Sequence, residues 1–126
     1  MRAAAWVTVV LLAGCGPGPT SAASCAGPTA SVSPRTAAAG DEVRVAGRYF
    51  TDGCRDTGQG GRDAAEQDVP VVLEQGGATW RLGSADATPD GFDLRVTVTV
   101  PAGVRPGPAH VRVGGARPVR VTLVDR

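Results

Sequence analysis

The densest group of side chains that could do chemistry lies in segment 51–68. Its acidic residues are Asp52, Asp56, Asp63, Glu66 and Asp68. Oxygen ligands on one loop suit Ca²⁺, but the acids do not have the alternating spacing of an EF-hand. Arg55 and Arg62 also offset part of the acidic charge. We therefore expect a solvated loop with no metal and no cofactor. In the alternative, a Ca²⁺-binding loop, the candidate ligands are Asp52, Asp56 and Asp63.

A catalytic site is not expected either. His110 is the single histidine, and Ser84 and Asp86 could in principle complete a triad with it. However, no G-x-S-x-G motif surrounds Ser84, and alternation places His110 on the outward face of a strand. The glycine-rich run 58–61 would need a strand before it and a helix after it to cradle a phosphate. The pattern indicates neither, so we predict that the protein is not an enzyme.

Three arginines occupy outward positions of predicted strands: Arg95, Arg112 and Arg120. If these strands are neighbours, the arginines form a basic patch suited to anionic lipid or a cell-wall polymer. Asp93 favours the alternative, a mixed charged surface. The whole chain carries 13 basic and 12 acidic residues, a net charge of +1. Such a chain has no overall field to attract nucleic acid, and no nucleic-acid partner is expected.

Short apolar runs separated by Gly, Pro and Asp predict strands. The clearest is 92–100, where Phe92, Leu94, Val96, Val98 and Val100 alternate with polar residues. Other runs are 42–45, 71–74, 79–82, 109–113 and 119–123, with a weaker one at 29–32. Gln75 to Ala78 should form a hairpin turn, and Trp80, taken as the one large aromatic of the domain, should lie in the core. No helical period is evident. The predicted fold class is all-β, a single antiparallel β-sandwich of about seven strands.

Residues 1–14 have the pattern of a signal peptide. Arg2 supplies a positive charge, and residues 3–13 are apolar apart from Thr8. A membrane-spanning helix needs about 20 apolar residues, so this run fits the hydrophobic region of a signal peptide better. A buried N-terminal helix is the alternative, but polar sequence rich in Gly and Pro follows the run at once.

The run ends in Leu11-Leu12-Ala13-Gly14-Cys15, which resembles the lipobox of bacterial lipoproteins. In that family a diacylglyceryl group is attached to the Cys thiol, and the chain is cut just before this Cys. The resemblance implies that Cys15 is the lipidated first residue, on the outer face of the cytoplasmic membrane. One acyl chain binds a membrane only marginally, whereas two would anchor the protein firmly. Residues 15–28 then provide a tether whose small residues, Pro and Ser are typical of flexible linkers.

If Cys15 carries lipid, Cys25 and Cys54 remain in an oxidising compartment. An even number of cysteines there favours a Cys25–Cys54 disulfide. It would close a loop of about 30 residues, for which chain entropy gives a stabilisation of roughly 3–4 kcal/mol. Two free thiols are the alternative. A closed zinc site would need four ligands, which this pair does not supply.

The predicted domain, residues 29–126, also resembles a known family. Ser33-Pro34 followed by residues 40–50 is similar to the opening of an Ig-like domain of the IPT/TIG kind. Residues 100–113 are similar to the later stretch of such a domain that has the pattern VP…PG…V.V. The cysteine pair and the long segment 51–68 depart from that pattern, although residues 54–58 resemble segments of actinobacterial Ig-like lipoproteins. The resemblance implies a monomeric, non-enzymatic binding or structural module that meets an envelope protein or a cell-wall component. The alternative is a small-ligand or Ca²⁺-binding lipoprotein that uses segment 51–68.

Overall fold

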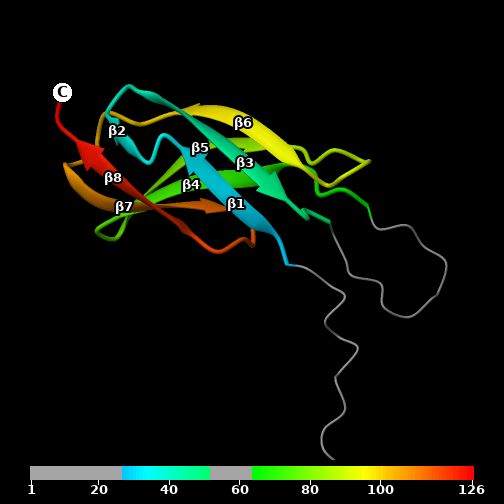
Figure 1. Cartoon of the computed structure of the whole chain (residues 1–126). Helices are drawn as coiled ribbons and strands as arrows, with labels where there is room; N and C mark the ends of the chain where they lie inside the picture. Colours follow the sequence, from blue (N-terminus) through cyan, green and yellow to red (C-terminus); the bar gives the residue numbers. More distant parts are fainter. Residues whose placement is uncertain (1–26, 52–63) are drawn as a thin grey trace, which may run out of the picture.

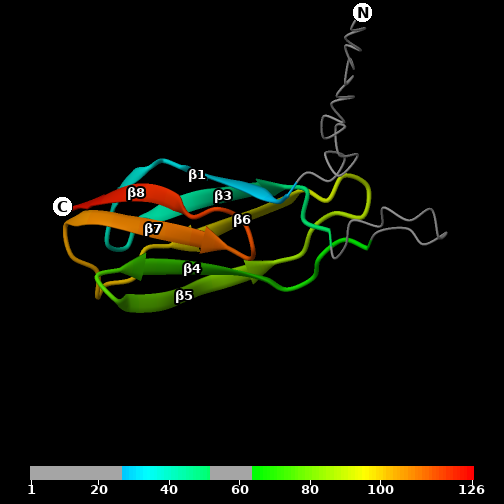
Figure 2. The same ribbon diagram turned by 90° about the horizontal axis from the view of Figure 1, so that it is seen from below.

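The computed structural model describes residues 27–51 and 64–126, and all its regular elements in these ranges are strands. In chain order they are β1 (Thr29–Ser33), β2 (Thr36–Ala38), β3 (Glu42–Arg48), β4 (Val69–Gln75), β5 (Ala78–Ala85), β6 (Leu94–Thr99), β7 (Gly107–Val113) and β8 (Val119–Val124). One sheet has the order β1-β3-β6 and the other has the order β2-β8-β7-β4-β5. The two sheets face each other (Figures 1 and 2). The predicted all-β sandwich is therefore confirmed.

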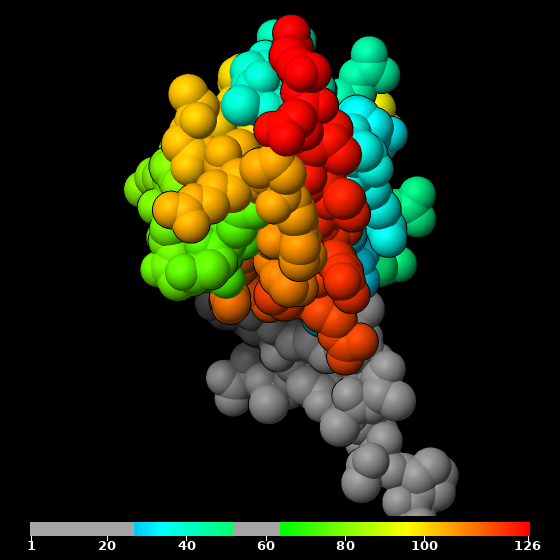
Figure 3. All heavy atoms as spheres, turned by 90° about the vertical axis from the view of Figure 1, so that its left-hand side faces the viewer, coloured from blue at the N-terminus to red at the C-terminus, as the bar shows by residue number. Residues whose placement is uncertain are grey.

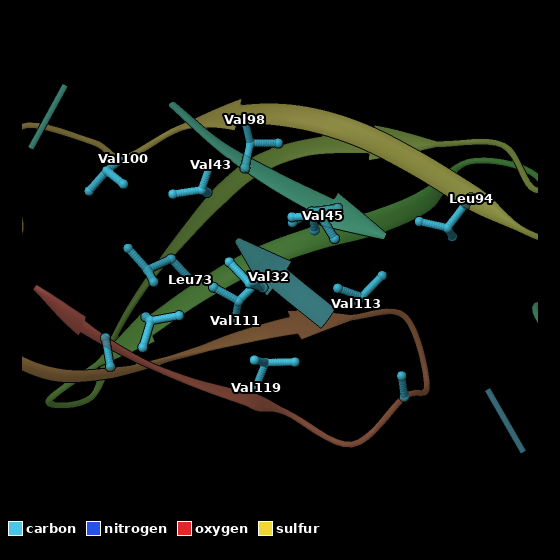
Figure 4. Packing of buried hydrophobic residues seen from close by; sticks show 14 of the residues in the cluster. Val32, Val43, Val45, Leu73, Leu94, Val98, Val100, Val111, Val113 and Val119 are labelled. Carbon is cyan, nitrogen blue, oxygen red and sulfur yellow. The ribbon is translucent and has the colours of Figure 1, made fainter. Parts of the chain in front are cut away.

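The space between the sheets is filled by the inward residues of the strands (Figure 4). In β3, for example, Val43 and Val45 are buried while Glu42 and Arg44 are exposed. This alternation follows from the two-residue period of a strand, which sends successive side chains to opposite faces. The buried cluster consists almost entirely of Val, Leu and Ala. Aliphatic residues thus supply most of the core of this chain.

The first strand of the sandwich is divided between the two sheets. β1 pairs antiparallel with β3, whereas β2 pairs parallel with β8 in the other sheet. Pro34, which follows a cis peptide bond, lies at the crossover. Proline has no N–H for a strand ladder, so it suits the place where pairing with one sheet stops. Because of this crossover, residues 27–51 and 64–126 form eight strands with one parallel pair, where the sequence predicts about seven antiparallel strands. β2 is too short to show a period of its own.

Two aromatic residues lie elsewhere than the alternation predicts. Phe92 precedes β6 in a turn, with φ at 56°, and its N–H donates to the Thr88 carbonyl over 2.9 Å. It is therefore not an inward residue of the strand. Trp80 is only half-buried at the rim of the core. The aromatic residue at the centre of the packing is instead Phe50, whose side chain is 0% exposed.

Phe50 fits into the core because Gly47 has no side chain. A Cβ atom at Gly47 would lie 2.3 Å from Cε2 of Phe50 and 3.1 Å from Cγ of Leu94. Gly83 on β5 is different, because a Cβ there would meet only Cγ1 of Val98, at 3.6 Å. A Cβ at Gly47 would therefore force Phe50 to move, whereas a Cβ at Gly83 would make an ordinary van der Waals contact with Val98.

We predict that Gly47→Ala lowers the free energy of unfolding by about 1–3 kcal/mol, the usual cost of overpacking a core. Gly83→Ala is the matched control, and it should change the stability by much less. Chemical denaturation of both variants measures the difference. Equal stability of the two variants would show that the Gly47–Phe50 contact does not limit the packing.

The turn between β2 and β3 is held by Asp41. Its carboxylate accepts a hydrogen bond from the Ala38 N–H over 2.8 Å and pairs with Arg126. Its backbone carbonyl accepts the Val100 N–H over 2.9 Å. The Ala38 hydrogen bond and then Arg126 lower the pKa of Asp41 below its ordinary value of 3.8. This one residue joins β2 to the end of β6 and to the C-terminus.

Because the pKa of Asp41 is lower in the folded chain than in the unfolded chain, the unfolded chain binds the proton first as the pH falls. We therefore expect the carboxylate to stabilise the fold fully above pH 3.8, and this contribution to disappear below that value. The difference in unfolding free energy between wild type and Asp41→Asn should shrink in the same window. Arg126→Gln should retain part of this pH dependence of stability, because the Ala38 N–H still donates to the Asp41 carboxylate. If the unfolding free energy of Asp41→Asn equals that of the wild type at every pH, the Asp41 carboxylate does not stabilise the fold.

Candidate binding surfaces

Several residues that the sequence singles out lie outside the described ranges. They are Cys15, Cys25, Cys54, Asp52, Asp56, Asp63 and the glycine-rich run 58–61. The predictions made for them therefore stay predictions. Within residues 27–51 and 64–126, no group of three or more His, Cys, Asp or Glu side chains is placed to hold a metal ion.

The two ends of the acidic segment are fastened to the same end of the sandwich. Thr51 forms an isolated β-bridge with Ala65, and the Glu66 N–H donates to the Phe50 carbonyl over 2.9 Å. The Asp68 N–H donates to Oδ1 of Asp86 over 2.7 Å. Asp86 thus has a structural role, because it holds the backbone where Asp68 takes a positive φ of 57°. Thr51 and Ala65, the two ends of segment 51–65, therefore lie side by side.

The structure separates the three residues that could have formed a catalytic triad. Ser84 pairs with Pro70 on β4, and His110 pairs with Glu74 on the other side of the same strand. At ~3.3 Å per residue, the two pairs lie about 13 Å apart along β4. The predicted outward position of His110 is confirmed by its exposure. Ser84, Asp86 and His110 therefore do not act on one substrate atom.

The predicted arginine patch is divided between the two sheets. Arg112 on β7 and Arg120 on β8 lie on neighbouring strands and share one outer face. Arg95 lies on β6, in the other sheet. The three arginines therefore do not form one patch, the possibility that the sequence left open. The reason is topological, because alternation shows which way a side chain points but not which sheet its strand joins.

The outer face of the five-stranded sheet carries mixed charge. Nε of Arg112 donates to Oε1 of Glu74 over 3.1 Å, and both side chains are partly exposed. Arg81 on β5 belongs to the same face. Its position is not evident from the sequence because Val71 pairs with Gly83 and Val72 with Arg81, a β-bulge that interrupts the alternation. The Glu74–Arg112 pair makes this face the mixed surface that the sequence analysis gave as the alternative.

The outer face of the three-stranded sheet carries three arginines together with hydroxyl side chains. We call it the arginine–hydroxyl face, and it consists of Arg44, Arg48, Arg95, Ser31, Ser33 and Thr97. At its centre is Ala46, which pairs with Ser31 on β1 and with Arg95 on β6. Because Ala46 is small, two adjoining shallow hollows form around it, and both include Ser31, Ala46 and Arg95. Sequence alternation gives the outward direction of each residue, but only the pairing of β1, β3 and β6 brings them together.

The arginines of this face are available to a ligand. Within the part of the chain that the structure describes, Arg44, Arg48 and Arg95 form no ion pair. A guanidinium group can donate two parallel hydrogen bonds to a carboxylate or phosphate, and the neighbouring hydroxyls add further donors. Asp93 lines one hollow, and Glu42 lies near the far end of β3. The face therefore suits a ligand whose negative charge lies over the centre.

The interior offers no comparable site. The hollow between the sheets is lined by apolar residues such as Val32, Leu73 and Val111, and its volume is about 10 Å³. A single water molecule needs roughly this much space. This hollow between the sheets is therefore too small for a ligand larger than a water molecule.

Comparison with protein families, with characterised proteins and with solved structures finds no match to this chain. Among the described residues, no helix has both the length and the apolar character required to cross a membrane. Inferences about function therefore rest on the residues and geometry of the chain itself.

Proposed function

We propose that the chain is an exported lipoprotein, held by lipid on Cys15 at the outer face of the cytoplasmic membrane. Its β-sandwich would be a non-enzymatic binding module of the cell envelope, related to Ig-like domains. One observation carries the proposal: Leu11-Leu12-Ala13-Gly14-Cys15 stands at the end of an apolar run that is too short to span a membrane.

The place where the described chain begins supports the proposed disulfide. β1 and β3 run antiparallel with Thr29 opposite Arg48, so the chain before β1 lies next to the chain after β3 (Figure 1). Cys25 is just upstream of this pair in the sequence and Cys54 just downstream. A disulfide requires Cα atoms about 4.4–6.8 Å apart, and the pairing of Thr29 with Arg48 favours such an approach between the sequence before β1 and the sequence after β3.

The arrangement of the sandwich also suits attachment at one end. The start of β1 and the two ends of segment 51–65 lie at the same end, whereas the C-terminus and the turn between β4 and β5 lie at the other (Figures 1 and 2). Figure 3 shows that opposite end, where the C-terminal residues cover part of the surface beside β7. A tether on Cys15 would leave this end and both outer faces free to meet a partner.

The arginine–hydroxyl face is the surface best suited to the proposed binding role. Its unpaired arginines favour a partner that carries phosphate or carboxylate groups. We propose an anionic cell-wall polymer as this partner, because the proposed location places the domain between the membrane and the wall.

The intact mass of the protein from a native membrane fraction tests the location. We expect the mass of residues 15–126 with a diacylglyceryl group on Cys15, and a gain of two hydrogens on reduction of Cys25–Cys54. A soluble, unmodified chain that begins elsewhere would overturn the lipoprotein proposal. An unchanged mass on reduction would overturn only the disulfide.

Co-sedimentation with isolated cell walls tests the ligand. We expect Arg44→Gln combined with Arg95→Gln to weaken binding by at least about tenfold, since charged hydrogen bonds contribute about 1.5–3 kcal/mol each. Arg81→Gln combined with Arg112→Gln is the matched control on the opposite face and should bind as the wild type does. Binding should also fall when the anionic polymers are removed from the walls. Equal loss in both double variants would exclude a role specific to the arginine–hydroxyl face.

A further inference from the structure

A second group of arginines lies beside the start of the described chain. We call it the tether groove: Arg35, Arg117 and Arg120 line it together with Gly27, Pro28 and Pro118. It runs between the beginning of β1 and the beginning of β8, two strands that are in contact. None of the residues that define the arginine–hydroxyl face lines this groove, although Thr29 and Ala30 border both the groove and one hollow of that face.

The backbone fixes the three arginines on one side of the sandwich. The Arg35 carbonyl accepts the Thr122 N–H over 2.7 Å, which holds Arg35 beside β8. Arg120 is an outward residue of β8, and Arg117 lies in the turn just before that strand. All three residues are exposed. None of them forms an ion pair within residues 27–51 and 64–126, and no acidic residue lines the groove there.

Chain length keeps this groove near the lipid that the proposed function places on Cys15. At no more than ~3.6 Å per residue, the segment from Cys15 to Gly27 spans at most about 40 Å. Gly27 itself lines the groove. A short linker of this kind gives its domain an effective concentration on the order of millimolar at the surface. Even a weak attraction between the groove and the headgroups would therefore keep the docked state populated.

We propose that the tether groove docks onto the anionic headgroups of the membrane that anchors the chain. Arginines attract an anionic lipid surface, and each one near that surface strengthens association by about fivefold at moderate salt. The groove carries only positive charge, whereas Asp93 and Glu42 border the arginine–hydroxyl face. Docking through the groove would set the orientation of the sandwich, so that one edge lies on the membrane and the arginine–hydroxyl face remains open to the wall. This inference rests on the lipid anchor of the proposed function.

Site-resolved modification of arginine with phenylglyoxal tests the proposal on the lipidated full chain. The protein is placed in vesicles of phosphatidylcholine alone or of phosphatidylcholine with phosphatidylglycerol, and the labelled arginines are quantified by mass spectrometry. We expect Arg35, Arg117 and Arg120 to react several-fold more slowly in the vesicles that contain phosphatidylglycerol. Arg44, Arg81 and Arg95 are internal controls and should react equally in both. High salt should remove the protection because it screens the surface charge.

The variant Arg117→Gln with Arg120→Gln provides a second measurement on exposed residues that the fold does not require. It should weaken docking by about 30-fold and restore the reactivity of Arg35. Flotation with phosphatidylcholine vesicles reports the lipid anchor separately. A chain that floats but shows equal labelling in both vesicles overturns docking and leaves the anchor intact, and so does protection of Arg44 and Arg95 instead of the groove. A chain that does not float overturns the proposed function itself.

Discussion

The packing of Phe50 holds together the end of the sandwich at which segment 51–65 leaves the sheets and returns to them. Its side chain fills the space left by Gly47, and a Cβ on Gly114 would lie 3.5 Å from its Cε1. Its N–H donates to the Phe92 carbonyl over 3.0 Å, and its carbonyl accepts the Glu66 N–H over 2.9 Å. Phe50 therefore joins β3, the turn before β6, the turn after β7 and the return of segment 51–65. The start of β1 lies at the same end (Figure 1).

Much of the fold follows from the sequence because the strands alternate cleanly. In β7 and β8 every second residue is buried, as the pattern of Val, Ala and Leu predicts. The features that the sequence does not reveal depend on contacts between distant residues. β2 is a strand only because β8 accepts it as a parallel neighbour. Phe50 lies between two strands, where no period applies, and its burial depends on Gly47 and Leu94.

The candidate sites were less predictable than the fold, for a related reason. Alternation correctly directs Arg95, Arg112 and Arg120 outward, yet it cannot assign their strands to sheets. The structure places Arg95 with Arg44 and Arg48, and it leaves Arg120 beside Arg35 and Arg117. A chain with a net charge of only +1 thus has two separate cationic surfaces. Two other acidic residues are paired with arginines outside these surfaces, Glu74 with Arg112 and Asp41 with Arg126.

The central claim is that lipid on Cys15 fixes where this sandwich works. Metabolic incorporation of an alkyne-bearing fatty acid tests it most directly, with the wild-type chain compared with Cys15→Ser in the same bacterial host. We expect the wild-type chain to take up the label and the Cys15→Ser chain to remain unlabelled. A wild-type chain without label, or a Cys15→Ser chain that keeps it, would show that Cys15 is not the lipidated residue.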